Sequence, residues 1–289
     1  DFDLAKNRFY EPFAGGAAVT FRLAGTSHAS ALPKNYARKA RIVINDSNSE
    51  LTGTYRVLRD RPEELIALLT QNFASRQGRS EYNAVRDEFN AASNFRRPSP
   101  GDELLQAARF LYLNRTGFNG LFRTNAGGNY NVPWGKQDIA AAKMCDAELL
   151  RVCSEWLQRV DVRNSGFVAA IEDVAVGDVV YLDPPYIPLS PTSAFSKYQA
   201  DDFKDASQAS VAAMIGWLTE KGARVILSNS DTERTSQLYR PHLVTYRSVP
   251  VRRTISADTG SRGMVSEVLA MNYDIKDCVD PGLIAALKA

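Results

Sequence analysis

The chain has 289 residues, of which 44% are hydrophobic and 24% are charged, so it is long enough for one large or two ordinary domains with a substantial core. Its formal net charge is only +2, which excludes nucleic-acid binding by overall charge and leaves local clusters of basic side chains as the electrostatic route. The sequence contains no apolar run long enough for a membrane-spanning helix.

The cysteines and histidines argue against a metal site. The spacing of the 3 cysteines, Cys145, Cys153 and Cys278, is not that of metal ligands, and the chain has only 2 histidines. We therefore expect no metal cofactor and a reducing, cytoplasmic setting.

The first elements predict a site for a nucleoside. Residues 8–13 are typical of a strand, Ala14-Gly15-Gly16-Ala17 of a tight turn and residues 18–23 of a helix, so a ligand can approach the glycine backbone beside a helix N-terminus. A second strand over 41–44 ends at Asn45-Asp46, where a carboxylate can bind the two hydroxyls of a ribose. The alternative role for Asp46 is a helix N-cap, because residues 47–50 open a helix.

The following segment predicts a mostly helical region. Helices are expected from Pro62, over 80–92, over 104–114 and over 147–157, with a turn-rich loop at 94–101.

Residues 114–136 interleave aromatic side chains with arginines, asparagines and glycines, and Ala126-Gly127-Gly128 is typical of a hairpin turn. Exposed Phe, Arg and Asn side chains on such a hairpin can wedge between base pairs and bond to base edges. The alternative is an ordinary glycine-rich ribbon whose aromatic side chains pack inward.

The segment Asp183-Pro184-Pro185-Tyr186 predicts a stiff loop at the end of a buried strand over 179–182, because two consecutive prolines cannot extend a sheet ladder. Open α/β sheets bind ligands at the carboxyl ends of their strands. The Asp183 carboxylate and the Pro184 carbonyl suit the two hydrogens of a planar amino group, and Tyr186 offers a flat face for a heterocycle. The alternative is a proline-rich turn with Tyr186 in the core.

Further strands are expected over 159–163 and 224–230, with a helix over 207–221 and a strand pair over 249–256 and 265–272. Phe167, after the first of these strands, can pack against a purine or fill the core. Arg252, Arg253 and Arg262 cluster around the loop of the strand pair, which fits either phosphate contacts or a solvated edge.

Taken together, these motifs resemble one family. The resemblance rests on Phe13-Ala14-Gly15-Gly16-Ala17, on residues 45–51, 112–123 and 131–135, and on residues 183–190 beginning with Asp183-Pro184-Pro185-Tyr186. The order, with a long insert between the glycine turn and Asp183, resembles the α-class of amino-methyltransferases and within it the Dam family of DNA adenine N6-methyltransferases, which act on GATC. The similarity extends from Phe9 to Tyr273.

The resemblance implies a role for each motif. S-adenosyl-methionine would be bound by Tyr10, Glu11, Pro12, Phe13, Gly15, Gly16, Asp46, Phe167 and Asp183. The target adenine would be held by Asp183, Pro184, Pro185 and Tyr186. Double-stranded DNA would be contacted by Arg115, Phe118, Asn119, Leu121, Arg123, Asn131, Pro133, Arg252, Arg253 and Arg262. Within that set, Arg123 would read a guanine, and Phe118 and Asn119 would enter the duplex beside the flipped base.

The sequence also departs from the family in three places. Ala17 replaces a glycine, which predicts a tighter approach of the cofactor, and Gly166 replaces an acidic or hydroxyl residue that faces the cofactor adenine. The family's Trp-x-Gly-Gly-Lys segment would stand before residue 1, and we expect the complete protein to carry it.

The sequence thus predicts an α/β protein with a Rossmann-like S-adenosyl-methionine-dependent methyltransferase sheet and an inserted, mostly helical DNA-recognition domain carrying a β-hairpin. We expect residues 1–52 and 158–275 to form the catalytic core, 53–157 the recognition domain and 276–289 a tail. The expected protein is a monomer of a bacterial or phage-infected cell, associated with the nucleoid and with a restriction endonuclease as a potential partner. The alternatives are transfer to another amino group, either cytosine N4 or a glutamine amide, and a DNA-binding protein of the same fold with impaired catalysis.

Overall fold

The computed structural model describes residues 6–23, 41–92, 100–136, 144–188, 205–252 and 264–274. The chain divides into two compact units, which are described separately: unit 1 comprises Asp1–Phe13, Arg38–Ile42 and Val168–Ala289, and unit 2 comprises Ala14–Ala37 and Val43–Phe167.

The described strands form one seven-stranded sheet in the order β3-β2-β1-β4-β5-β7-β6. Their bounds are β1 Arg8–Glu11, β2 Arg41–Asn45, β3 Val160–Arg163, β4 Val179–Leu182, β5 Arg224–Ser230, β6 Thr245–Arg252 and β7 Met264–Met271. The strand order and the helices between the strands make this the Rossmann-like α/β fold that the sequence predicts. The predicted positions of β1 to β5 and of β7 agree with those observed, but β6 spans Thr245–Arg252 and begins earlier than the strand expected over 249–256, because residues 245–248 also pair with β7.

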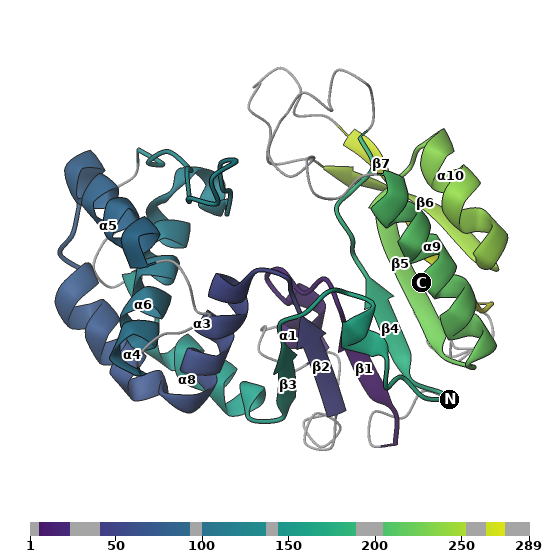
Figure 1. Ribbon diagram of the computed structural model, residues 1–289, viewed down its shortest axis with the longest axis horizontal. Coiled ribbons are helices and arrows are strands. Elements are labelled where there is room, and N and C mark those ends of the chain that lie inside the picture. Colours follow the sequence, from purple (N-terminus) through teal and green to yellow (C-terminus); the bar gives the residue numbers. More distant parts are fainter. Residues whose placement is uncertain are drawn as a thin grey trace, which may run out of the picture. The chain divides into compact units, whose positions relative to one another are not determined.

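In unit 1, β1, β4 and β5 run parallel, with Tyr10 opposite Val180 and Val180 opposite Val225 (Figure 1). After β1 the chain adds β2 and β3 on one side of β1, and it then adds β4 on the other side. The direction in which strands are added to the sheet therefore reverses between β1 and β4. Such a switch point separates the loops at the carboxyl ends of the two strands and leaves room for a ligand. The amino ends are tied together, since the Arg8 backbone N–H donates to Asp178 Oδ1 at 2.7 Å.

The described part of unit 1 also contains two helices, α9 Asp205–Glu220 and α10 Glu233–Tyr239, and the antiparallel strands β6 and β7, with short 3-10 turns at Ala169–Ile171 and Arg240–His242. The strand β7 pairs antiparallel with both β5 and β6. Pro250, which cannot donate to a ladder, is tolerated because β6 is the edge strand of the sheet.

Unit 2 is mostly helical (Figure 1). Its helices are α1 Ala18–Leu23, α3 Ser49–Asp60, α4 Pro62–Leu68, a π-helical turn Leu69–Phe73, α5 Gly78–Ala92, α6 Pro100–Thr116, a 3-10 turn Phe118–Gly120 and α8 Ala147–Leu157. The helices predicted over 18–23 and 147–157 are confirmed, whereas α5 begins at Gly78 and α6 extends from Pro100 to Thr116, so both are longer than predicted. The π-helical and 3-10 turns were not predicted, and residues 94–99 of the expected loop lie outside the described residues. None of the helices in the described parts of either unit is long and apolar enough to cross a membrane.

A buried carboxyl lies where α3 and α6 pack together in unit 2. Glu50 on α3 is 7% exposed, and its polar neighbour Gln106 on α6 is 3% exposed. Glu50 Oε2 and Gln106 Oε1 are buried acceptors with no donor among the described residues. Burial raises the pKa of Glu50 from 4.5 to about 7, opposed by a hydrogen bond with Gln106. A proton on Glu50 would supply one of the missing donors, so the folded protein favours the neutral acid.

This raised pKa predicts a pH-dependent stability. The contribution of neutral Glu50 is fully present below the unfolded pKa and is lost as the pH rises through about 7. Glu50→Gln removes this loss, so its advantage in unfolding free energy over the parent should grow with pH and approach about 3 kcal/mol at alkaline pH. Chemical denaturation at acidic and alkaline pH measures the difference.

The matched control is Glu63→Gln on α4, because Glu63 is an exposed glutamate whose pKa is lowered by a hydrogen bond from Arg151. It should show no gain at alkaline pH. An advantage of Glu50→Gln that is the same at every pH would contradict the assignment of a neutral Glu50.

Candidate functional site

The carboxyl ends of β1 and β4 bring two acidic residues to one edge of the sheet in unit 1. Glu11 is the last residue of β1, and Asp183 follows the last residue of β4 directly. Because β1 and β4 are parallel and in register at Tyr10 and Val180, both chains leave the sheet at the same edge. Glu11 is 3% exposed, whereas Asp183 is exposed to solvent.

Asp183 is the end of a chain of hydroxyl groups. Ser228 Oγ on β5 donates to Asp183 Oδ1 at 2.8 Å, and the Tyr181 hydroxyl lies 3.1 Å from Ser228 Oγ. The Tyr186 hydroxyl donates to Glu267 Oε2 on β7 at 3.3 Å. Desolvation by the surrounding protein raises the pKa of Asp183 although its side chain is partly open to solvent, and hydrogen bonds from Ser228 and Tyr186 oppose the rise. The carboxyl is therefore a stronger proton acceptor than an ordinary aspartate.

The two prolines after Asp183 differ in whether their carbonyl groups accept a hydrogen bond. Gln208 Nε2 on α9 donates to the Pro185 carbonyl at 2.7 Å, and the Ile187 N–H donates to Asn229 Oδ1 at 3.0 Å. These bonds fix the loop on both sides of Tyr186. No donor in the described parts of the chain reaches the Pro184 carbonyl, which follows a buried strand and can accept a hydrogen bond from a ligand.

The glycine turn begins unit 2 and is open on its outer side. Gly15 has a φ of +47°, which glycine adopts without strain, and a Cβ on either Gly15 or Gly16 would meet no atom of the described residues within 4 Å. Ala17 has a φ of 48° but is fully buried, so its methyl group does not narrow the open side. The tighter approach of the cofactor expected from Ala17 stays a prediction; the structure shows an alanine in the left-handed region, which costs backbone strain.

Asp46 organises the glycine turn. Its Oδ2 accepts from the Gly15 N–H at 3.0 Å, and its Oδ1 accepts from the Asn48 N–H at 2.8 Å. Asn48, not Asp46, caps α3, since the Asn48 side chain accepts from the Glu50 and Leu51 N–H groups. A carboxylate has about four acceptor sites, so two protein donors orient Asp46 and leave acceptor capacity for ribose hydroxyls. An open glycine turn beside an oriented carboxylate fits the nucleoside part of S-adenosyl-methionine.

Asn45 is a residue whose role the sequence analysis missed. It is 1% exposed at the end of β2, accepts from the Ser165 N–H at 2.9 Å and donates to the Ser165 carbonyl at 3.1 Å. These bonds hold the loop before the half-buried Phe167 against the end of β2 in unit 2. An asparagine after an apolar strand was the available signal, but its partner lies far along the chain.

Further residues expected to bind the cofactor lie at the end of β1 and directly after it. In unit 1, Tyr10 and Pro12 are buried and Phe13 is half-buried, and the Arg8 guanidinium lies 5.1 Å from the centre of the Tyr10 ring.

In unit 2, residues 117–135 fold back on themselves as a ribbon, which we call the recognition ribbon. It turns at Asn125–Gly128, where the Asn125 N–H donates to the Asn129 carbonyl, but its ladder consists of isolated bridges and not of continuous strands. At its base a Cβ on Gly117 would lie 2.6 Å from the Leu113 carbonyl oxygen, and one on Gly135 would lie 3.0 Å from the Gly117 oxygen. Only glycine allows the backbone segments at the base of the ribbon to approach this closely.

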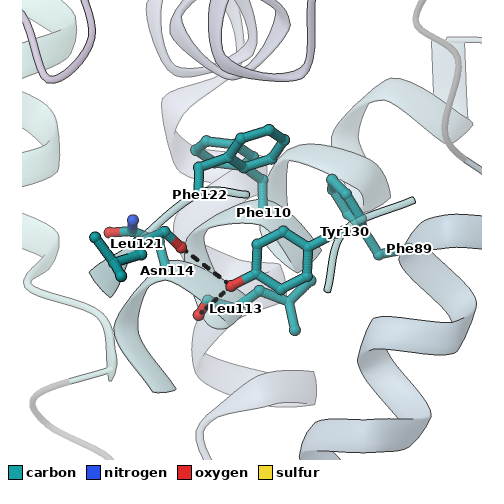
Figure 2. Close-up of a pocket in the computed structure, with 7 residues that line it drawn as sticks. All are labelled: Phe89, Phe110, Leu113, Asn114, Leu121, Phe122 and Tyr130. Carbon is teal, nitrogen blue, oxygen red and sulfur yellow. Dashed lines mark hydrogen bonds between the residues drawn. The ribbon is translucent and has the colours of Figure 1, made fainter. Parts of the chain in front are cut away.

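Aromatic side chains anchor the recognition ribbon to the helices beneath it. The ring of Phe122 lies 5.5 Å from Phe110 on α6 and 5.5 Å from Tyr130, and Tyr130 lies 5.8 Å from Phe89 on α5. Figure 2 shows the Tyr130 hydroxyl directed at the Leu113 and Leu121 carbonyls. The inward packing weighed in the sequence analysis thus applies to Phe122 and Tyr130.

Other ribbon residues face outward. Phe118 is 39% exposed, and Asn119, Pro133 and the helix-end Arg115 are also exposed, with Leu121 half-buried. Asn119 has a φ of 53°, and the Phe118 N–H donates to the Pro133 carbonyl at 2.9 Å. The ribbon therefore holds an aromatic ring and an amide at a fixed, exposed turn.

Arg123 and Asn131 face one another across the recognition ribbon. Arg123 Nε donates to Asn131 Oδ1, and Arg123 Nη2 donates to the Asn131 carbonyl at 2.8 Å. Asn131, expected to contact DNA, fixes the plane of this guanidinium. Arg252 ends β6, while Arg253 and Arg262 lie outside the described residues.

The fold and the motif at the end of β4 define an amino-methyltransferase, and comparison with known proteins identifies its kind. The chain matches the family described as D12 class N6 adenine-specific DNA methyltransferase over residues 2–255, and it belongs to that family. Membership implies S-adenosyl-methionine as methyl donor and DNA as substrate. Within the described residues, no group of three or more His, Cys, Asp or Glu side chains is arranged to hold a metal ion.

Three relatives show the extent of the similarity. A type II methyltransferase from Lactococcus lactis subsp. cremoris is 36% identical over 269 residues, covering 92% of this chain and 87% of the relative. A type II methyltransferase from Methanocaldococcus jannaschii is 34% identical, covering 92% of this chain and 88% of its own. A DNA adenine methylase from Escherichia coli strain K12 is 33% identical, covering 86% and 83%.

The open glycine turn predicts a separation of cofactor affinity from stability. Gly16→Ala adds a methyl group that meets no atom of the described residues within 4 Å, so the melting temperature should not change. If the cofactor lies against this turn, the methyl group collides with the ligand and weakens S-adenosyl-methionine binding by about 1–3 kcal/mol. Calorimetric titration and thermal unfolding of the same sample measure both effects. An unchanged dissociation constant would remove the cofactor from Gly16.

Proposed function

We propose that the protein is a site-specific DNA adenine N6-methyltransferase that acts on GATC in double-stranded DNA and draws the target adenine out of the helix. The observation that carries the proposal is the pair of acceptors at the end of β4, namely the Asp183 carboxylate oriented by Ser228 and the Pro184 carbonyl with no donor among the described residues. Family membership supplies the substrate class.

The two acceptors suit the amino group of adenine. Asp183 and the Pro184 carbonyl each accept one N6 hydrogen, which orients the nitrogen lone pair away from them and increases its electron density. S-adenosyl-methionine, when bound, supplies an electrophilic methyl group on a sulfonium sulfur. The new bond to N6 forms as the sulfur–methyl bond breaks to leave S-adenosyl-homocysteine, and the Asp183 carboxylate, whose pKa is raised, can take the proton that N6 loses. The protein needs no covalent intermediate, so orientation and fixed dipoles provide the acceleration. The flat face of Tyr186 supports the adenine ring, and Gln208 and Asn229 keep the loop that carries Tyr186 in place.

Asp46 and the glycine turn are assigned to the cofactor. The support is the carboxylate that Gly15 and Asn48 orient, together with the open side of the turn. We assign the two ribose hydroxyls to Asp46 as donors. The adenine of the cofactor is assigned to Phe167, which follows the loop that Asn45 holds.

A duplex adenine must leave the stack before it can be methylated. We assign this step to Phe118 and Asn119, because an exposed ring on a rigid turn can fill the space of an extruded base. Arg123 is assigned to a guanine of GATC, since a guanidinium bonding to O6 and N7 is the commonest specific base contact. The names of the Escherichia coli and Salmonella relatives, DNA adenine methylases, support adenine in DNA as the methylated base.

The central test is transfer of a tritiated methyl group to duplexes that differ only at GATC. Methylation of the GATC duplex, with radioactivity recovered as N6-methyladenine, is the expected result. Label on cytosine would favour the N4 alternative, and binding of DNA without transfer would favour a protein with impaired catalysis.

Asp183→Ala should abolish methyl transfer while leaving the melting temperature and DNA binding near those of the parent, because it removes an acceptor that faces the amino group. Single-turnover assays with saturating cofactor and DNA measure the loss. A variant that still methylates within about tenfold of the parent, a range worth about 1.4 kcal/mol of barrier, would overturn the role of Asp183.

Arg123→Ala should cost about 1–3 kcal/mol on the cognate duplex and relax the preference at one base pair. The control is Arg252→Ala, which removes a proposed phosphate contact and should weaken binding to all duplexes alike and flatten the salt dependence. Titrations on cognate and singly substituted duplexes at two salt concentrations separate the two outcomes. Equal weakening of every duplex by Arg123→Ala would make the recognition ribbon a backbone clamp and remove the main physical support for GATC.

A further inference from the structure

Tyr181, Asp183 and Ser228 lie on one face of the sheet in unit 1. Side chains alternate along a strand, so Tyr181 and Asp183 share a face, as do Ile226 and Ser228. The parallel register pairs Tyr181 with Ile226 and Leu182 with Leu227, which brings the next residues, Asp183 and Ser228, side by side. Ser228 is 8% exposed, so its hydroxyl has little access to water and depends on protein partners.

The direction of the two hydrogen bonds follows from the number of protons. Ser228 has one hydroxyl proton and donates it to Asp183 Oδ1 at 2.8 Å, because an ionised carboxylate can only accept. The contact of 3.1 Å between Tyr181 and Ser228 Oγ must then have Tyr181 as its donor. Burial raises the pKa of Tyr181 to about 12, so its donor proton is present throughout the working pH range.

We propose that Tyr181 and Ser228 form a hydroxyl relay that orients the catalytic carboxylate of Asp183, with both acting as positioning residues. The proposal rests on the function proposed above for Asp183. With Oδ1 held by Ser228, rotation of the carboxylate is restricted, so the second oxygen keeps one position toward the amino group. Polarisation of Ser228 by Tyr181 strengthens the bond to Asp183.

The relay also favours the ionised form of Asp183. Desolvation raises the pKa of Asp183, and the Ser228 hydrogen bond opposes this rise. The other titratable groups around the relay are Tyr186, whose hydrogen bond also lowers the pKa of Asp183, and the acidic residues Glu267 on β7 and Glu11 on β1. None of them is a cation that could replace Ser228. Loss of the Ser228 hydroxyl therefore raises the pKa of Asp183 further, and the acid limb of the rate profile moves to higher pH.

The experiment compares the full-length parent with Ser228→Ala, Tyr181→Phe and the double variant, in single-turnover methyl transfer between about pH 5 and pH 9. The control is Ser230→Ala, two residues along the same strand. Ser230 is also buried, at 1% exposed, but its Oγ has no partner among the residues that the structure describes. The KM for DNA and the dissociation constant of S-adenosyl-methionine are measured for each variant.

Ser228→Ala is expected to lower kcat by about 10- to 100-fold, the range for loss of one hydrogen bond to a charged group, with unchanged KM and an acid limb at higher pH. Tyr181→Phe should lower kcat less, and it should have no further effect in the Ser228→Ala background. Ser230→Ala should match the parent. Tyr181→Phe keeps its ring, so it tests the relay by itself if Ser228→Ala does not fold.

Several results would overturn the relay. The first is a Ser228→Ala variant whose kcat and acid limb match those of the parent. The second is a Tyr181→Phe substitution that lowers kcat equally in the parent and in the Ser228→Ala background. The third is a Ser230→Ala variant that loses as much kcat as Ser228→Ala, which would indicate an effect of strand packing. A failure of the proposed function itself is recognised separately, since the parent would then give no N6-methyladenine; retained transfer in Asp183→Ala would instead remove the role of Asp183 on which the relay depends.

Discussion

The parallel pairing of β1 with β4 is the constraint on which the candidate site in unit 1 depends. It places the ends of two strands at one edge, and the reversal of strand order there keeps the following loops apart. The aspartate and two prolines can form a rigid acceptor site only because the ladder ends at Leu182. Pairing of β4 with β5 then provides Ser228 and Asn229, whose side chains bind the carboxylate and the loop behind it. The pairing of β4 with β5 thus positions both the Asp183 carboxylate and the residues that hold it.

The recognition ribbon in unit 2 is exposed at its turn and yet holds a fixed shape. It divides its aromatic residues between two tasks: Phe122 and Tyr130 pack on α5 and α6, while Phe118 remains at the surface. At the base of the ribbon, Gly117 leaves room for the Leu113 carbonyl of α6, and Gly135 allows a close approach to the Gly117 carbonyl of the other arm. Contact with a nucleic acid therefore need not pay the entropy of ordering this segment.

Several polar side chains at the proposed sites are held by hydrogen bonds within the protein. Asp46 binds two backbone N–H groups, Asn131 binds Arg123, and Ser228 binds Asp183. In each case a residue that faces a ligand in the proposed function is already oriented by the protein, which lowers the cost of assembling the site. The buried Glu50 shows the opposite arrangement, because no described donor satisfies its Oε2 and burial favours its neutral form.

The sequence by itself determined the α/β class, the positions of β2, β4 and β5, the helix from Ala147 to Leu157, and the candidate residues Asp183, Pro184, Asp46 and Arg123. These follow from local signals, namely apolar runs, prolines, glycines and charged residues at strand ends, and family resemblance joined them into one function. Only the tertiary structure decided which residues form hydrogen bonds with one another. Asn45 meets Ser165, Ser228 meets Asp183 and Asn131 meets Arg123 through folding, and the first two pairs are far apart in sequence. The role of Ala17 and the cap of α3 likewise depended on backbone angles and hydrogen-bond geometry, which periodicity and composition do not encode.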